Sequence, residues 1–393
     1  MMKITSVICE YNPFHLGHAY QISEMKKRGA VIAVMSGSFT QRGTPAILSK
    51  YERAQAAVCG GADLVLELPF PYCSSRADIF GAAGVRIASA LGCVDELCFG
   101  SETGNVEALI RINERLASDT FRKALADRLA ESHALSQRTV SAEVYAELYG
   151  KETALEGSND ILSLAYLAAI REQKSTLRPV AIQRIGERYD GSGTGFASAT
   201  SVRSALLEGN TDKIKNAVPP ESARLLCDAI KTGTIANEEN LYVLFAMLMR
   251  TGREEALLRA PDTPADLASR MAKAAKQAES TERLIALTQT RRFSPSRIRR
   301  AMLYAVTGVT ASDLGTVPYT TVLAANETGR KILSAIRKSA AFPIVTKPAD
   351  ANLFGEEIEK AFSLCARADS IWTLLTDTPA PGNRMMKEHP RML

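Results

Sequence analysis

Residues 1–205 alternate short, β-branched apolar runs with longer segments of helical spacing. An alternation of this kind is typical of a parallel sheet wrapped by helices, because a helix carries the chain back between parallel strands. Ligands of such folds bind in the loops beyond the carboxyl ends of the strands, so these loops are where a site is expected. The spacing predicts strands at residues 4–10, 30–35, 63–68, 94–99 and 179–185, and helices at residues 18–27, 51–59, 78–91, 106–148 and 160–171.

Strand signals become rare after residue 201, and helical patterns separated by Gly, Pro and Thr take over. We therefore predict an α/β chain with a Rossmann-like parallel sheet in residues 1–205 and an α-helical domain in residues 206–393. The tail, residues 378–393, is Pro-rich and polar, and we expect it to be poorly ordered.

The net charge of +5 is distributed unevenly along the chain. Residues 1–205 carry 22 Lys and Arg against 22 Asp and Glu, so the whole positive excess lies in residues 206–393. This asymmetry is compatible with a polyanionic partner for the second half. Charge alone favours a solvated surface with a small charge imbalance equally.

The seven cysteines form no Cys-x-x-Cys pair, which argues against a disulfide framework or a zinc site and favours a reducing compartment. No signal pattern and no apolar run long enough for a membrane span is present. We therefore expect a soluble, cytoplasmic protein without a membrane partner.

The loop after the first predicted strand contains two of the four histidines of the chain, His15 and His18, on either side of Gly17. A helix that begins here offers free N–H groups and the positive end of its dipole, which suit a phosphate. Gly17 lets a nucleotide approach the backbone, and two imidazoles three positions apart can donate to phosphate oxygens. No third His or Cys lies at metal-ligand spacing, so no protein metal site is predicted.

A second motif, Ser198-Ala199-Thr200-Ser201-Val202-Arg203, follows the last predicted strand. Together with the histidine motif it resembles the HxGH nucleotidyltransferase superfamily, whose members join ATP to an acceptor through the α-phosphate. The resemblance implies that His15 and His18 are catalytic and stabilise the transferring phosphates. It also implies that Thr200, Ser201 and Arg203 hold the β- and γ-phosphates, with Thr200 and Ser201 as hydroxyl or helix-capping donors.

Six motifs taken together resemble one family, the bacterial tRNA(Met) cytidine acetate ligases. They are EYNPFHLGH at residues 10–18, SGSFTQRGTPA at 36–46, PFPYCSSRADIFG at 69–81, FGSE at 99–102, SNDIL at 158–162 and SATSVR at 198–203. The family joins acetate to ATP, giving acetyl-adenylate and pyrophosphate. It then transfers the acetyl group to N4 of the wobble cytidine of elongator tRNA(Met). The chain departs from the family pattern at Leu16, Gln21 and Ser158, where Asn, His and Pro are expected.

Carried over by position, the resemblance implies a nucleotide site made of the first loop and helix together with residues from four later segments. Mg²⁺ is expected to accompany the ATP phosphates, because pyrophosphate carries charge that must be neutralised. The implied ATP contacts are Ile8, Cys9, Glu10, Tyr11, Asn12, Pro13, Phe14, His15, Leu16, Gly17, His18, Ala19, Tyr20, Gln21, Gly100, Asn159, Arg184, Ile185, Thr200, Ser201 and Arg203.

Five arginines lie within ten residues of the second half, with Phe293 between them. Arginine binds phosphate oxygens bidentately, and an aromatic ring can stack on a base. With the positive excess confined to this half, we interpret the cluster as a tRNA contact rather than a DNA contact, since no major-groove reading motif is present. Arg297 and Arg300 are expected to share a helix face that Arg299 does not. The predicted tRNA-binding residues are Arg291, Arg292, Arg297, Arg299 and Arg300.

Two other functions explain part of the pattern. An adenylyltransferase acting on a small metabolite accounts for both phosphate motifs but leaves the arginine cluster without a role. A non-catalytic RNA-binding protein with a degenerate nucleotide domain accounts for the cluster, yet His15, His18 and Arg203 are intact. A class I aminoacyl-tRNA synthetase is disfavoured, because no Lys-Met-Ser-Lys-Ser-like loop follows the predicted sheet.

Overall fold

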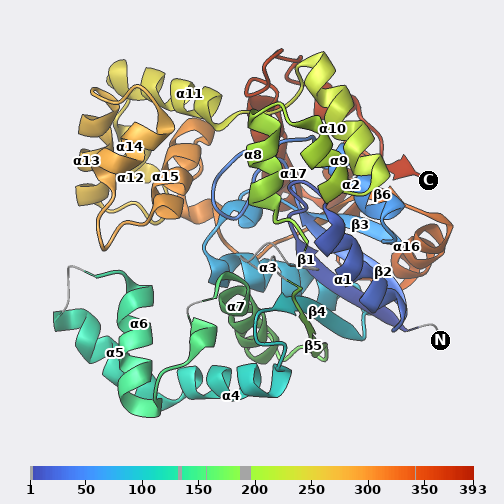
Figure 1. The fold of residues 1–393 in the computed structure, drawn as a ribbon, viewed down its shortest axis with the longest axis horizontal. Helices are drawn as coiled ribbons and strands as arrows, with labels where there is room; N and C mark the ends of the chain where they lie inside the picture. Colours follow the sequence, from blue (N-terminus) through green and yellow to red (C-terminus); the bar gives the residue numbers. More distant parts are fainter. Residues whose placement is uncertain (1–2, 132–134, 156, 186–195, 341) are drawn as a thin grey trace.

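The computed structural model describes residues 3–131, 135–155, 157–185, 196–340 and 342–393. A single sheet lies at its centre, with the strand order β5-β4-β1-β2-β3-β6-β7, and β8 pairs with β6 (Figure 1). The first five strands are mutually parallel and fall where the sequence predicts strands. They are β1 (Ile4–Cys9), β2 (Ala30–Ser36), β3 (Leu64–Leu68), β4 (Glu96–Ser101) and β5 (Arg178–Gln183).

The central strands are apolar because both faces of the sheet are covered. Every residue of β2 and β3 is buried. Figure 1 shows the helices that follow the strands packed around this sheet. They are α1 (Leu16–Lys26), α2 (Lys50–Cys59), α3 (Ala77–Ala90) and α7 (Ser158–Glu172), each close to a predicted helix. The α/β prediction with a parallel sheet is confirmed.

Between β4 and α7 the chain forms a helical arm that extends away from the sheet (Figure 1). The helical character predicted for residues 106–148 is confirmed, but the stretch is divided into three helices. The segment folds as α4 (Val106–Ala117), α5 (Asp119–Glu131) and α6 (Gln137–Tyr149). The first break falls at Ser118, whose extended backbone ends α4 and whose hydroxyl accepts from the Phe121 N–H at 3.2 Å. A serine that caps a new helix in this way satisfies an otherwise unpaired backbone donor.

Two groups of helices follow, the second forming a separate lobe beside the sheet (Figure 1). The first group comprises α8 (Ala199–Leu207), α9 (Thr211–Ala217) and α10 (Pro220–Thr232). The lobe comprises α11 (Glu238–Arg250), α12 (Glu255–Arg259), α13 (Ala265–Ala275), α14 (Thr281–Thr288) and α15 (Pro295–Thr307). The helical character expected of the second half is confirmed here.

The sheet continues beyond residue 205, which the sequence did not indicate. β6 (Thr320–Ala325) is wholly buried and pairs antiparallel with β3, and β7 (Ile344–Val345) and β8 (Arg391–Met392) pair with β6. The remaining helices are α16 (Glu327–Ser339), α17 (Glu356–Trp372) and α18 (Arg384–Lys387). The expected disorder of the tail is wrong, because β8 and the Leu393 N–H bond to the last residues of β6. The boundary near residue 205 stays a prediction.

A buried ionic cluster fastens α17 to the first half of the chain. The Lys50 ammonium lies 2.9 Å from a Glu67 carboxylate oxygen and 2.7 Å from an Asp369 oxygen, and all three side chains are buried. Ser38 donates to the other Asp369 oxygen at 2.6 Å. Residues more than 300 positions apart therefore meet behind the loop that follows β2.

Within the described residues, no helix combines the length and the apolar character that crossing a bilayer requires.

Candidate nucleotide and tRNA site

The two histidines of the first loop lie at the N-terminus of α1, at the carboxyl end of the central strand β1. His15 caps the helix, and its Nδ1 accepts from the Gly17 N–H at 3.0 Å. The His18 Nδ1 accepts from the His15 N–H at 3.3 Å, and the two rings stack with centroids 3.6 Å apart. Because each Nδ1 is an acceptor, each neutral ring carries its proton on Nε2. Both imidazoles thus keep a donor for an incoming ligand.

Burial, together with the positive charges of Arg184 and Arg203, lowers the pKa of His15 to about 4. The pKa of His18 is lowered well below its usual value by burial, by His15 and by Arg184. Both rings are therefore neutral near pH 7 in the ligand-free protein. A polyphosphate between Arg184 and Arg203 would offset the field that keeps them uncharged.

Arg203 reaches the first loop from α8. Its two terminal nitrogens donate to the Asn12 carbonyl at 2.8 Å and to the Thr200 hydroxyl at 3.0 Å. Ser198, rather than the expected Thr200 or Ser201, caps α8 by accepting from the Ser201 N–H at 3.1 Å. The Arg203 guanidinium therefore lies against the loop that precedes His15 and His18.

The opposite side of the site is built from β4, α7 and the end of β5. Arg184 donates to the Asn159 side-chain oxygen at 2.6 Å, and the Asn159 amide donates to Glu102 at 2.6 Å. A Cβ on Gly100 would lie 3.4 Å from Arg184 Cγ and 3.9 Å from Gln21 Nε2, which places Gly100 directly beside both side chains. Four of the separated predictions, at Gln21, Gly100, Asn159 and Arg184, are thus neighbours in space.

The side chains of three residues predicted from the first loop, Ile8, Tyr11 and Phe14, are buried in the core. The Tyr11 ring packs edge-on against Phe14 at 4.9 Å and lies 4.8 Å from His18, so aromatic rings support the histidine pair. Their contact with a nucleotide stays a prediction. The other loop positions, with Ile185 at the exposed end of the site, stay predictions.

Sequence reasoning missed two residues that shape the site. Arg53 is fully buried and donates to the carbonyl oxygens of Glu10, Ser36 and Gly37, which fixes the loops after β1 and β2 together. Phe196 lies beside Gly17 and packs against Tyr20, with ring centroids 5.7 Å apart. For Arg53, the available signal in the sequence was an arginine among the alanines of the helix predicted at residues 51–59. Phe196 carried no such signal.

Four of the five arginines in the cluster at residues 291–300 form ion pairs with acidic side chains. Arg292 lies 2.7 Å from Asp266, and Arg297 and Arg300 both reach Asp262, at 2.8 and 3.7 Å. Arg299 instead pairs with Glu238, so the predicted split of the helix faces is confirmed. The most available member is Arg291, which is exposed and has no ion pair among the described residues.

The expectation that Phe293 stacks on a base is wrong. Its ring is only 3% exposed and packs under Arg292 and Arg297, whose guanidinium carbons lie 5.1 and 5.3 Å from the ring centroid. The ring orients the two arginines, because a cation over an aromatic face is attracted to it.

Comparison with known proteins identifies the family. The family model described as HIGH Nucleotidyl Transferase matches residues 2–387. A protein of Acetivibrio thermocellus named tRNA(Met) cytidine acetate ligase is 33% identical, with 89% of each chain covered. A protein of the same name from Leuconostoc mesenteroides is 34% identical over 97% of each chain. The chain belongs to the tRNA(Met) cytidine acetate ligase family.

Solved structures agree with this assignment. A crystal structure of Thermotoga maritima TmcAL described as bound with alpha-thio ATP superposes with a TM-score of 0.91, at 29% identity and with both chains fully covered. The apo form of the same protein gives a TM-score of 0.92. The predicted family and fold class are confirmed over the whole chain. At Leu16 and Gln21 the chain still departs from the expected family pattern, although His15, Gly17 and His18 are retained.

Acidic side chains near the nucleotide site are already engaged by the protein. Glu10 accepts from the Gln41 N–H at 2.6 Å, and Glu102 accepts from Asn159. Among the described residues, the one group with metal-ligand proximity is Glu67, Cys365 and Asp369. The Lys50 ammonium lies within that group, so lysine supplies its positive charge and we assign no metal there.

Proposed function

We propose that this chain is an ATP-dependent ligase that acetylates N4 of the wobble cytidine of elongator tRNA(Met). The observation that carries the proposal is the stacked His15–His18 pair at a helix N-terminus, flanked by Arg184 and Arg203. Relatives that match most of the chain bear the name of this activity, and a solved neighbour is described as bound with an ATP analogue.

In the first step, an acetate oxygen attacks the α-phosphorus of ATP, the bond to the β-phosphate bridging oxygen breaks, and acetyl-adenylate and pyrophosphate form. His15 and His18 donate from Nε2 to phosphate oxygens as negative charge develops on them. Arg203 and the hydroxyls of Thr200 and Ser201 hold the β- and γ-phosphates from the other side. The positive dipole end of α1 adds to this field.

Mg²⁺ would be carried by the ATP phosphates, since the neighbouring Glu10 and Glu102 already accept protein N–H groups. It would neutralise charge on the departing pyrophosphate. Adenine and ribose would be bound by the backbone of residues 8–21 and by Gly100, Asn159, Arg184 and Ile185.

In the second step, the cytidine N4 attacks the acetyl carbon, the bond to the AMP phosphate oxygen breaks, and N4-acetylcytidine, AMP and a proton are released. Residues 1–205 would supply the nucleotide site and residues 206–393 the tRNA surface, with Arg291 as its most accessible arginine. A protein that modifies tRNA in this way would act in the cytoplasm.

The activity is tested by incubating the purified chain with ATP, Mg²⁺, labelled acetate and unmodified elongator tRNA(Met), followed by mass spectrometry of the nucleosides. We expect N4-acetylcytidine in the absence of coenzyme A, with AMP and pyrophosphate as products. ATP cleavage that requires a small acceptor instead of tRNA would replace this proposal with the small-metabolite adenylyltransferase.

The role of the histidine pair is tested by acetate-dependent exchange of labelled pyrophosphate into ATP, which needs no tRNA. His18→Ala is expected to abolish exchange while the far-UV circular dichroism spectrum stays unchanged. His389→Ala removes an exposed imidazole near the C-terminus and serves as the control. Exchange at the unsubstituted rate in His18→Ala would remove the catalytic assignment.

A further inference from the structure

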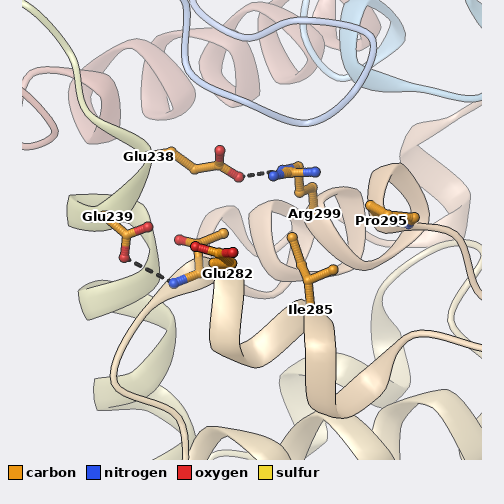
Figure 2. A pocket seen from close by; sticks show the side chains of 7 residues that line it. Glu238, Glu239, Glu282, Ile285, Pro295 and Arg299 are labelled. Atoms are coloured by element: carbon orange, nitrogen blue, oxygen red, sulfur yellow. Dashed lines mark hydrogen bonds and ion pairs between the residues drawn. The ribbon is translucent and has the colours of Figure 1, made fainter. Parts of the chain in front are cut away.

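A cavity of about 350 Å³ opens in the helical lobe, where α11, α14 and α15 meet (Figure 2). Its volume is within the range of small-molecule sites, about 300–1,000 Å³. Figure 2 shows Glu238 and Arg299 joined by a hydrogen bond, with Ile285 and Pro295 as apolar lining residues. Its lining consists of Glu238, Glu239, Thr281, Glu282, Ile285, Pro295 and Arg299.

The cavity offers hydrogen-bonding groups that the protein leaves unused. Arg299 donates through Nε to one oxygen of Glu238. Neither the second Glu238 oxygen nor the two terminal nitrogens of Arg299 has a hydrogen bond to any described residue. The Thr281 hydroxyl, on a side chain only 3% exposed, also lacks a partner. Thr281 is one of the residues that line the cavity, and burial of its hydroxyl without a partner costs free energy.

Contacts on the far side connect the cavity to the nucleotide site. Burial lowers the pKa of Arg203, and the negative charges of Glu10 and Glu238 oppose that shift, so Glu238 lies within electrostatic reach of the phosphate-side arginine. The loop after β2 contacts both the nucleotide site and the helical lobe that contains the cavity. Its Gln41 N–H donates to Glu10 at 2.6 Å, and a Cβ on Gly43 would lie 2.7 Å from the Arg300 backbone nitrogen in the middle of α15.

We propose that this cavity binds the cytosine base that accepts the acetyl group; the inference rests on the proposed function. Cytosine presents an N4 amine as donor and N3 and O2 as acceptors along one edge. The free Glu238 oxygen accepts from N4, and the Arg299 terminal nitrogens donate to N3 and O2. Ile285 and Pro295 pack against the faces of the ring, as apolar side chains do for bases taken out of a stack.

A second cavity continues the path for the flanking nucleotides. It measures about 430 Å³, shares Pro295 with the first, and extends to α6 of the helical arm. Arg291 and Arg138 both line it, together with Ser136, Thr139 and Thr290. Cations and hydroxyls of this kind bind RNA phosphates. The anticodon loop therefore lies between the arm and the lobe with its wobble base turned into the first cavity.

The test compares Glu238→Gln and Thr281→Val with two matched controls. Glu279→Gln removes an exposed carboxylate close by in the chain, and Thr288→Val removes another buried, unpartnered hydroxyl of α14; neither residue lines the cavity. Each protein is assayed for acetate-dependent pyrophosphate exchange without tRNA and for kcat/KM with elongator tRNA(Met). Inhibition by the same tRNA with uridine at the wobble position is measured against the cytidine form.

We expect unchanged exchange in Thr281→Val and in both controls, whereas Glu238→Gln is judged by its cytidine preference, because Glu238 acts electrostatically on Arg203. Thr281→Val should lower kcat/KM for tRNA by about 10-fold, because base contact gives the hydroxyl the partner that it lacks. Unsubstituted protein should prefer the cytidine form by roughly 10- to 100-fold. In Glu238→Gln this preference should collapse towards one, because a glutamine amide can donate to the uracil O4.

Normal exchange with an unchanged cytidine preference in Glu238→Gln and an unchanged kcat/KM in Thr281→Val would overturn the proposal. If Glu238→Gln fails to fold and loses exchange, Thr281→Val decides by itself, since the hydroxyl it removes has no partner in the protein. Failure of the proposed function has a different signature, because the unsubstituted protein would then neither exchange pyrophosphate nor acetylate tRNA.

Discussion

Replacement of Lys50 by Met tests how strongly the two halves of the chain depend on their shared buried charges. The Lys50 ammonium contacts Glu67 at 2.9 and 3.1 Å and Asp369 at 2.7 Å, in a region where all three residues are at most 4% exposed. Methionine retains the length of the aliphatic stem but leaves two carboxylates facing each other without a cation. Breaking a buried ion pair by removing one partner costs about 3–5 kcal/mol.

That loss corresponds to a melting temperature lower by about 6–10 °C, at roughly 2 °C per kcal/mol for a chain of this size. The deficit should also depend on pH. Burial raises the pKa of Glu67, and Lys50 opposes that rise. Without Lys50 the folded state binds a proton at Glu67 more readily than the unfolded state, so stability falls as pH increases. The deficit should therefore be larger near about pH 8 than near about pH 5.5.

The assay is thermal unfolding followed by circular dichroism at both pH values. Lys360→Met is the control, because it removes an exposed lysine of α17 and should change stability by less than about 0.5 kcal/mol. A melting temperature within about 2 °C of the unsubstituted protein, or a deficit that grows as pH falls, would refute the reasoning.

Four further predictions concern other parts of the molecule. In Gly17→Ala, the new Cβ would lie 2.9 Å from the His15 ring, so pyrophosphate exchange should fall about 100-fold with little change in melting temperature. Glu96→Gln should cost about 2 kcal/mol at neutral pH, because hydrogen bonds from Arg28 and other cations hold the pKa of this buried carboxyl well below its usual range. The difference from the unsubstituted protein should begin to shrink below about pH 4.5, where the carboxylate protonates in the unfolded chain. It should be lost fully only at much lower pH, where the carboxylate also protonates in the folded chain. Arg291→Ala should weaken tRNA binding and reduce the slope of log affinity against log salt by about 1, as measured by filter binding. Arg300→Ala should instead lower the melting temperature, because that side chain is buried against Asp262.

The sequence by itself determined the elements whose signals are local. Buried parallel strands read as continuous apolar runs, so β1 to β4 were predicted closely, and the partly exposed edge strand β5 was also placed correctly. The His15–His18 motif and the Ser198–Arg203 motif were recognisable because helix N-termini require particular residue types at fixed spacing. The spacing also predicted correctly that Arg297 and Arg300 share a helix face.

Only the tertiary structure decided features that depend on distant partners. β6 is six residues long and lies among helical patterns, and it becomes a strand because β3 offers an open edge. Phe293 has the composition of a base-stacking residue, but helix packing buries it. The charges of Lys50 and Asp369 are separated by 319 positions, and no local pattern signals that they meet. The cavity around Glu238 and Arg299 likewise exists only where three helices converge, because hydrogen bonding and burial there are set by contacts across space rather than by neighbours along the chain.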